Sequence, residues 1–204
     1  MVLQAFDPGG IRMKYILASM SPRRKEILTE MGIEFTVEPS DVDENIGITD
    51  PKLLVKELSL LKGTNIASKH IGENSLVIAA DTVVALNGEI LGKPSDEKDA
   101  ERMLLMLSGN THSVYTGYCV SDCKTGKTVS KCAETKVTFR ELEQSEITDY
   151  IKSGEPMDKA GAYGIQGGAG KFVTETDGEY SNVVGLPKDA LANLLKEEFT
   201  FEGR

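Results

Sequence analysis

The chain has 204 residues, 40% of them hydrophobic, so it is long enough to bury one core and short enough to be a single domain. Its formal net charge of -9 argues against a broad basic surface for polymeric nucleic acid, and a small anionic ligand requires a local basic pocket. No apolar run approaches the roughly 18 residues of a membrane span, and the N-terminus lacks the charged-then-apolar order of a signal peptide. We therefore expect a cytoplasmic protein with no membrane partner.

The first dozen residues fit poorly with the regular pattern of the remaining chain. The run from Asp7 to Gly10 is typical of a turn or linker, and Met13 offers a second start. We therefore predict that residues 1–12 are a tail or an added extension and that residues 13–204 form one domain. The cysteines are odd in number and no ligand pair completes a zinc pattern, so reduced thiols are expected at Cys119, Cys123 and Cys132.

Apolar runs and cap signals predict the elements of the first half of the chain. Strands are expected at 15–18, 35–37 and 76–80, and helices from Pro22 to Met31 and from Pro51 to about Lys69. Ser21 has the position of an N-cap, and Gly32 ends the first helix. The acidic, turn-rich stretch from Ser40 to Asp50 is expected to be a loop.

The second half continues the alternation of strands and helices. A hairpin of 83–86 and 89–91, joined by Asn87 and Gly88, precedes a helix over 95–107. Further strands are expected at 112–121, 127–138 and 170–173, and helices at 145–152 and 188–196. Interleaved strands and helices indicate an α/β fold, and the hairpin favours a mixed sheet over a purely parallel one.

A cluster of phosphate-binding groups lies where the first strand gives way to a helix. The segment contains the hydroxyls of Ser19 and Ser21 and the guanidinium groups of Arg23 and Arg24. The free N–H groups of a helix's first turn attract anions, and arginine presents a planar fork that suits phosphate. The alternative is that Ser21 merely caps the helix and the arginines are solvated.

Two further motifs carry a charged group next to a strand or turn. Asp81 and Thr82 form a polar pair expected after an apolar strand, where a carboxylate binds a divalent metal or accepts a proton from water. In Gly92-Lys93-Pro94, the proline holds Lys93 extended, and its ammonium is a point charge for phosphate. Taken alone, Asp81 is at least as typical of an ordinary turn residue, and Lys93 is more typical of a solvated lysine in a turn.

The glycine-rich stretch over 153–168 predicts a long functional loop, because its hydrophobic period is weak and such loops are rare in compact domains. Within it, Gln166 carries a carboxamide that both donates and accepts, as reading a base edge requires. The segment 181–187 is interpreted as the mainly structural end of a buried strand before the last helix.

In combination, the segments LASMSPRR, ADTVV, GKP, DKAGAYGIQG and NVVGLP resemble the Maf family of nucleotide pyrophosphatases, over about Lys14 to Lys196. The resemblance implies two lobes around a deep cleft, similar to inosine triphosphate pyrophosphatases, and a homodimer. It also implies hydrolysis of a nucleoside triphosphate to the monophosphate and pyrophosphate. Because Thr82 follows the acid, the sequence looks like the subgroup that acts on dTTP and UTP.

The resemblance assigns roles residue by residue. Asp81 matches the proton acceptor, and the positions linked to nucleotide specificity are Arg23, Thr82 and Gln166. The phosphate-binding loop matches Ser19, Ser21 and Arg24, and the active-site lysines match Lys62 and Lys93. Glu44 matches an active-site carboxylate, and it would hold magnesium or manganese together with Asp81, since both ions prefer oxygen ligands.

Two other functions are compatible with parts of this pattern. A nucleotide-binding regulator of cell division without turnover needs the Ser-Arg segment but not Asp81. A phosphatase or kinase-like enzyme fits less well, because the sequence contains neither a Walker motif nor a recognisable aspartyl nucleophile motif. Release of pyrophosphate rather than orthophosphate distinguishes the pyrophosphatase from these alternatives.

Overall fold

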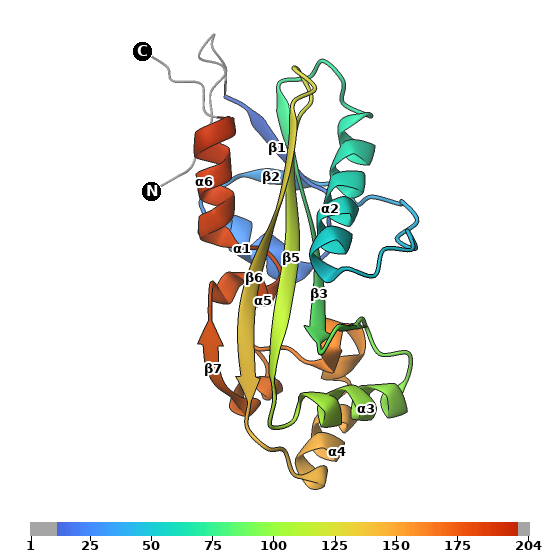
Figure 1. The fold of residues 1–204 in the computed structure, drawn as a ribbon. Helices are drawn as coiled ribbons and strands as arrows, with labels where there is room; N and C mark the ends of the chain where they lie inside the picture. The colour runs from blue at the N-terminus through green and yellow to red at the C-terminus, as the bar shows by residue number, and fades with distance from the viewer. Residues whose placement is uncertain (1–11, 200–204) are drawn as a thin grey trace.

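The computed structural model describes residues 12–199, which form a seven-stranded mixed sheet with helices on both faces (Figure 1). The main strand order is β2-β1-β3-β5-β6-β7, and β4 pairs with β3 outside this path. The strands are β1 (Lys14–Leu17), β2 (Phe35–Val37), β3 (Ser75–Leu86), β4 (Glu89–Leu91), β5 (Thr111–Asp122), β6 (Thr128–Phe139) and β7 (Val173–Asp177). β1 pairs in parallel with β2 and β3, and all other pairs are antiparallel. The prediction of a mixed α/β sheet is therefore confirmed.

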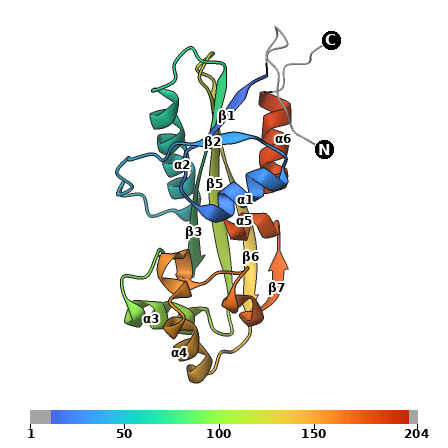
Figure 2. The same ribbon diagram turned by 180° about the vertical axis from the view of Figure 1, so that it is seen from behind.

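The helices surround the long central strands in two groups (Figures 1 and 2). They are α1 (Pro22–Glu30), α2 (Pro51–Ala67), α3 (Glu97–Leu107), α4 (Gln144–Lys152), α5 (Tyr180–Val184) and α6 (Lys188–Glu198). In what we call the upper lobe, α2 covers one face of the sheet, and α1 and α6 cover the other. In the lower lobe, α3 and α4 pack with the far ends of β3, β5 and β6 around a second core.

Most predicted elements occur within two residues of their expected bounds, and the largest difference is β3. The sequence predicted a strand that ends before Asp81 and a separate hairpin strand over 83–86. Instead, one strand of 12 residues runs from Ser75 to Leu86. Its ladder with β5 is continuous from Leu76 to Ala85, so Asp81 and Thr82 are members of the ladder rather than turn residues.

Two predictions near the C-terminus are wrong. Residues 168–172 form a short 3-10 helix, and the strand β7 begins only at Val173 instead of spanning 170–173. The segment 181–187 does not end a strand, because Tyr180–Val184 is the short helix α5. Its last turn ends at Gly185, where φ is 124°, a backbone conformation that favours glycine. Residues 1–11 of the predicted leader lie outside the described residues.

One edge of β3 is only partly covered by neighbouring strands. β1 pairs with β3 from Ser75 to Ile78, and β4 pairs from Val84 to Leu86. Between these two stretches, at residues 79–83, β3 has a strand neighbour only on its β5 side among the described residues. The chain after β1 turns away here into α1 and leaves room for a cleft between the lobes.

Candidate active site

A cleft of about 930 Å³ opens beside this uncovered part of β3. Every site residue predicted from the sequence lines it: Ser19, Ser21, Arg23, Arg24, Glu44, Lys62, Asp81, Thr82, Lys93 and Gln166. These residues come from the β1–α1 connection, the acidic loop, α2, β3, the segment after β4 and the glycine-rich loop. The fold therefore gathers segments far apart in sequence at one place.

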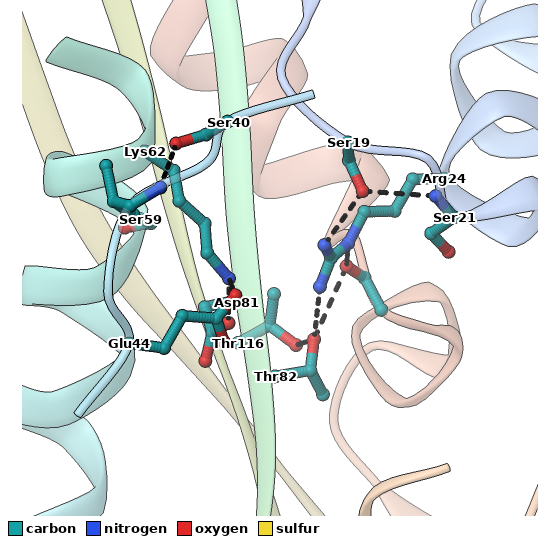
Figure 3. Close-up of polar contacts among 12 residues, drawn as sticks. Ser19, Ser21, Arg24, Ser40, Glu44, Ser59, Lys62, Asp81, Thr82 and Thr116 are labelled. Atoms are coloured by element: carbon teal, nitrogen blue, oxygen red, sulfur yellow. Dashed lines mark hydrogen bonds and ion pairs between the residues drawn. The ribbon is translucent and has the colours of Figure 1, made fainter. Parts of the chain in front are cut away.

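Asp81 and Thr82 serve opposite faces of the sheet, because successive side chains of a strand alternate. Figure 3 shows Asp81 beside Lys62 and Glu44 on the α2 side, whereas Thr82 meets the Arg24 guanidinium on the other side. Adjacent residues of one strand thus contribute to two polar clusters. The cleft reaches both clusters because β3 has an uncovered edge there.

The first cluster is two carboxylates that share one ammonium group. Lys62 Nζ donates to Asp81 Oδ1 at 2.6 Å and lies 2.9 Å from Glu44 Oε1. The side chains of Lys62 and Asp81 are each 12% exposed, whereas that of Glu44 is 59% exposed. Lys62 and Asp81 therefore form a nearly buried, charge-assisted pair. Glu44, carried by the loop between β2 and α2, closes the pair from the solvent side.

The second cluster holds Arg24 by neutral acceptors. Its Nε donates to the carbonyl of Gly185 at 2.8 Å, Nη1 donates to Ser19 Oγ at 3.1 Å, and Nη2 donates to Thr82 Oγ1 at 3.2 Å. The Thr82 hydroxyl in turn lies 2.9 Å from that of Thr116 on β5. Burial lowers the pKa of Arg24 from its ordinary value, and the nearby charge of Asp81 opposes this shift.

Arginine stays protonated in proteins, so the guanidinium of Arg24 carries a positive charge. It has no direct carboxylate partner among the described residues. Neutral oxygens fix its orientation, and none of them neutralises it. A partly buried cation of this kind attracts an anion that enters the cleft. Sequence reasoning predicted the arginine but missed the carbonyl of Gly185 and the hydroxyl of Thr116. The segment around Gly185, interpreted as mainly structural, thus also serves the site.

The turn before α1 supplies further donors. The Ser21 N–H donates to Ser19 Oγ at 3.2 Å, and Ser21 is the N-cap of α1 but makes no side-chain capping bond. Ser21 and the first residues of α1 line the cleft, and the free N–H groups of a helix's first turn attract anions. Arg23 lies 3.9 Å from Asp158 of the glycine-rich loop, and this contact spans the cleft.

The glycine-rich loop is fixed by a carboxylate that the sequence analysis did not single out. Glu155 accepts from the Tyr150 hydroxyl at 3.0 Å and from the Gly168 N–H at 3.0 Å. A Cβ at Gly167 would lie 1.9 Å from this carboxylate, so any side chain there would displace it from both bonds. Gln166, which directly precedes Gly167, is exposed and lines the cleft. Its carboxamide has no hydrogen-bond partner among the described residues.

Lys93 is exposed at the cleft and has no ion-pair partner among residues 12–199. Its ammonium is therefore a cation whose charge is not balanced by a neighbouring carboxylate. The three cysteines are free thiols, as predicted, and two of them are buried. No helix of the described part of the chain is long and apolar enough to span a membrane.

Glu44 and Asp81 fit a divalent metal ion only when a bound substrate supplies further oxygen ligands. Within residues 12–199 no group of three or more His, Cys, Asp or Glu side chains is arranged to hold a metal ion. Glu44 and Asp81, however, both reach Lys62 Nζ and thus meet at one point of the cleft. Magnesium commonly takes one or two carboxylates, with phosphate oxygens and water completing its shell. The donor set therefore suits a metal that arrives with a phosphorylated substrate.

The chain is similar in sequence to several known proteins. A protein of Clostridium perfringens named dTTP/UTP pyrophosphatase is 52% identical over 186 residues, which cover 90% of this chain and 96% of that protein. One of the same name from Thermococcus gammatolerans is 49% identical over 184 residues, with 90% and 96% covered. The solved nucleoside-triphosphatase / dITP/XTP pyrophosphatase of Mycobacterium abscessus aligns at 17% identity and a TM-score of 0.41, over 62% of this chain and 74% of that one.

The family described as Maf-like protein matches residues 14–198. This span contains every residue of the cleft and nearly all described elements. With close relatives that align over almost their whole length, the resemblance inferred from the five motifs is confirmed. The chain belongs to the Maf-like protein family.

Proposed function

We propose that this protein is a nucleoside triphosphate pyrophosphatase that prefers dTTP and UTP. The observation that carries the proposal is the Asp81–Lys62–Glu44 cluster, which faces the same cleft as the Ser19–Arg24 segment. Relatives at 46–52% identity that are named dTTP/UTP pyrophosphatases support the activity and the choice of base. The reaction adds water across the bridge between the α- and β-phosphorus and releases the monophosphate and pyrophosphate.

The cations of the cleft suit a triphosphate in a protein whose net charge is -9. Arg24 and Lys93 have no carboxylate partner among the described residues, and Arg23 has only a 3.9 Å contact with Asp158. Each charge-assisted hydrogen bond to phosphate contributes roughly 1.5–3 kcal/mol. The arginines and lysines would bind the triphosphate and stabilise charge on the leaving pyrophosphate.

Asp81 is the proposed proton acceptor from the attacking water. It is buried, it lies at the cleft, and its orientation is fixed by the 2.6 Å bond from Lys62. Glu44 and Asp81 would hold a divalent metal, magnesium or manganese. That ion, when bound, neutralises phosphate charge and lowers the pKa of water.

The choice of base is assigned to Gln166. Uracil and thymine each present a carbonyl acceptor beside an N–H donor, and one carboxamide pairs with both groups. Cytosine presents a different pattern at that edge, and a purine is larger. A good bidentate contact discriminates by roughly 1–3 kcal/mol, so dTTP and UTP should be hydrolysed about tenfold faster than CTP.

A nucleotide-binding regulator of cell division without turnover is the second candidate. It would use the Ser19–Arg24 segment, but it gives no reason for a buried carboxylate held at 2.6 Å by a lysine inside the same cleft. The homodimer and the cytoplasmic location implied by the sequence stay predictions. Light scattering of the purified protein, which gives its molar mass in solution, would test the homodimer.

The deciding experiment separates turnover from binding. The purified protein is incubated with dTTP, UTP, CTP, ATP and GTP and magnesium, and the products are identified by chromatography and a pyrophosphate-specific assay. We expect dTMP or UMP with stoichiometric pyrophosphate. Tight binding without any product would support the regulator, and release of orthophosphate would indicate a phosphatase.

A further inference from the structure

Helix α2 lies unusually close to the sheet at the point where Asp81 lies in the ladder. Gly117 on β5 is the residue paired with Asp81 on β3. A Cβ added at Gly117 would lie 1.9 Å from the backbone oxygen of Val55 and 2.7 Å from the backbone nitrogen of Lys56, both in α2. No side chain fits at position 117 between β5 and this helix. The backbone of α2 therefore rests directly on β5 beside the acid.

A second, less close approach of α2 to the sheet lies about two turns later along the helix, beside Lys62. A Cβ at Gly63 would lie 3.0 Å from Cys119 Sγ, 3.4 Å from Ser121 Oγ and 3.5 Å from the Cβ of Ala79. Ala79 lies on β3 two residues before Asp81, and Cys119 is its partner on β5, so a side chain at position 63 would meet residues of both strands. Gly63 itself is buried and lies within α2.

These contacts set the distance over which Lys62 must reach. Lys62 immediately precedes Gly63, and Figure 3 shows its side chain extending from α2 to Asp81. The bond between Nζ and Oδ1 is 2.6 Å, near the short limit for such a pair, and it weakens when the donor retreats by a fraction of an ångström. Alanine favours a helix more than glycine does, so the glycine at position 63 runs against local helix propensity.

We propose that Gly63 and Gly117 are positioning residues for the reaction: they seat α2 against β3 and β5 so that Lys62 holds Asp81 in its working orientation. Neither glycine lines the cleft, so both would act through the Lys62–Asp81 contact. The inference rests on the proposed function, because Asp81 is taken there as the proton acceptor.

The first test is Gly63→Ala with a repair variant. The added methyl group pushes α2 away from Cys119, so we expect kcat for dTTP to fall about tenfold while KM changes less than about twofold. Cys119→Ala removes the obstructing sulfur, and the double variant Gly63→Ala/Cys119→Ala should recover kcat to within about twofold of Cys119→Ala alone. Thr64→Ala, an exposed substitution one residue further along α2, is the matched control and should keep the wild-type kcat.

A double-mutant cycle shows whether the glycine acts through the lysine. In the Lys62→Met background the contact with Asp81 is already gone, so Gly63→Ala should lower kcat no further. A general packing defect would lower it by the same factor in both backgrounds. Equal losses in both backgrounds, or a Gly63→Ala enzyme with wild-type kcat, would overturn the proposal. So would a loss that Cys119→Ala does not repair.

A structural readout keeps this inference separate from the proposed function. A crystal structure of Gly63→Ala should show a Lys62–Asp81 separation clearly longer than 2.6 Å, and a separation unchanged from that of the wild type would overturn the inference without any activity measurement. If the wild-type protein fails to release pyrophosphate from dTTP, the proposed function fails instead. In Gly117→Ala the added methyl group lies against the backbone of α2 rather than a side chain. We therefore expect the folded Gly117→Ala protein to lose more kcat than Gly63→Ala does.

Discussion

Lys62 has two carboxylate neighbours of different exposure, and this difference suggests different roles. Asp81 is buried with Lys62, whereas Glu44 is more than half exposed on a loop. Charges near the surface are screened by water, so the Lys62–Glu44 contact adds little to folding stability. The buried contact is the stronger constraint on geometry. Asp81 is therefore the carboxylate whose orientation the protein constrains more tightly.

Asp81→Asn is expected to reduce kcat by a factor of about 10² or more, because the amide keeps the shape of the side chain but accepts no proton. Steady-state release of pyrophosphate from dTTP measures the effect. Binding of dTTP by the variant, followed by calorimetry, should persist, since the arginines and Lys93 are unchanged. A variant with near-native turnover would remove Asp81 from the proposed mechanism.

Gln166→Ala should erode the choice of base without removing the reaction. The carboxamide has no partner among the described residues, so its loss leaves no protein group unsatisfied. We expect the ratio of kcat/KM for UTP over CTP to fall from about tenfold toward one, with the magnesium dependence unchanged. If the variant keeps the full ratio, base recognition lies elsewhere in the cleft.

The residues of the site could be predicted from the sequence better than the contacts between them. Ser19, Arg24 and Lys93 stand in short motifs, and each of them lines the cleft. The oxygens that orient Arg24 could not be foreseen, because one is the carbonyl of Gly185, a group that every residue has. The other hidden partner, Thr116, becomes visible only when the register of β3 and β5 is known.

Helix α2 links folding to the site because it carries Lys62 and is anchored at its first turn. Asp50 is the N-cap of this helix, and its carboxylate accepts from the Leu53 N–H at 2.8 Å. A second contact ties the other end of the helix region to the segment after β2: His70 Nε2 lies 2.7 Å from Glu38. The acidic loop with Glu44 therefore runs between two fixed ends.

Asp50→Ala should destabilise the protein by about 1 kcal/mol, the usual cost of an N-cap side chain. Urea unfolding at pH 7 followed by circular dichroism measures the change in free energy. Asp50→Ser keeps an acceptor oxygen at the cap and is the matched control, with an expected loss of only a few tenths of a kcal/mol. Equal losses in the two variants would show that the cap bond is not the cause.

The elements that sequence patterns predicted well are those whose own residues determine them. α2 has Asp50 and Pro51 at its start and an apolar face, and it forms where expected. The sequence pattern predicted two strands in place of β3, because a polar pair in an apolar run is typical of a strand end. Asp81 and Thr82 remain in the strand because β5 pairs with both and each has a polar partner of its own. Such partners come from distant segments, so no local pattern reports them.

A buried histidine on β5 contacts the glycine-rich loop in the lower lobe. His112 Nε2 lies 2.8 Å from the hydroxyl of Tyr163, and its ring packs edge-on against Phe139. Nδ1 is buried without a partner among the described residues. Burial lowers the pKa of His112 to about 4, so the folded protein keeps this ring neutral.

This histidine makes stability depend on pH in a definite direction. Below about pH 6.5 the imidazole of the unfolded chain takes up a proton, whereas the folded one stays neutral until about pH 4. The unfolded state therefore binds more protons in that window, and the free energy of unfolding falls as the pH falls from about 6.5 to about 4. Between pH 7 and pH 5, His112 should account for a loss of about 2 kcal/mol.

His112→Asn removes the titrating group and keeps a polar side chain beside Tyr163. Urea unfolding of both proteins at pH 7 and pH 5 should show the wild type losing about 2 kcal/mol more than the variant over this interval. The comparison between proteins cancels the contribution of the carboxylates. Equal losses would mean that His112 is protonated in the folded state or already neutral in the unfolded one.

The uncovered part of β3 also limits how the chain can change in length. β1 ends opposite Ile78 and β4 ends opposite Val84, so the cleft stays open along this edge only while neither strand is longer. An insertion after Leu17 that prolonged β1 would pair with the stretch containing Asp81 and close the entrance. By contrast, insertions at the exposed tip of Asn87 and Gly88 extend away from that edge. We therefore expect insertions at Asn87 and Gly88 to be tolerated and insertions in the β1–α1 connection to abolish function.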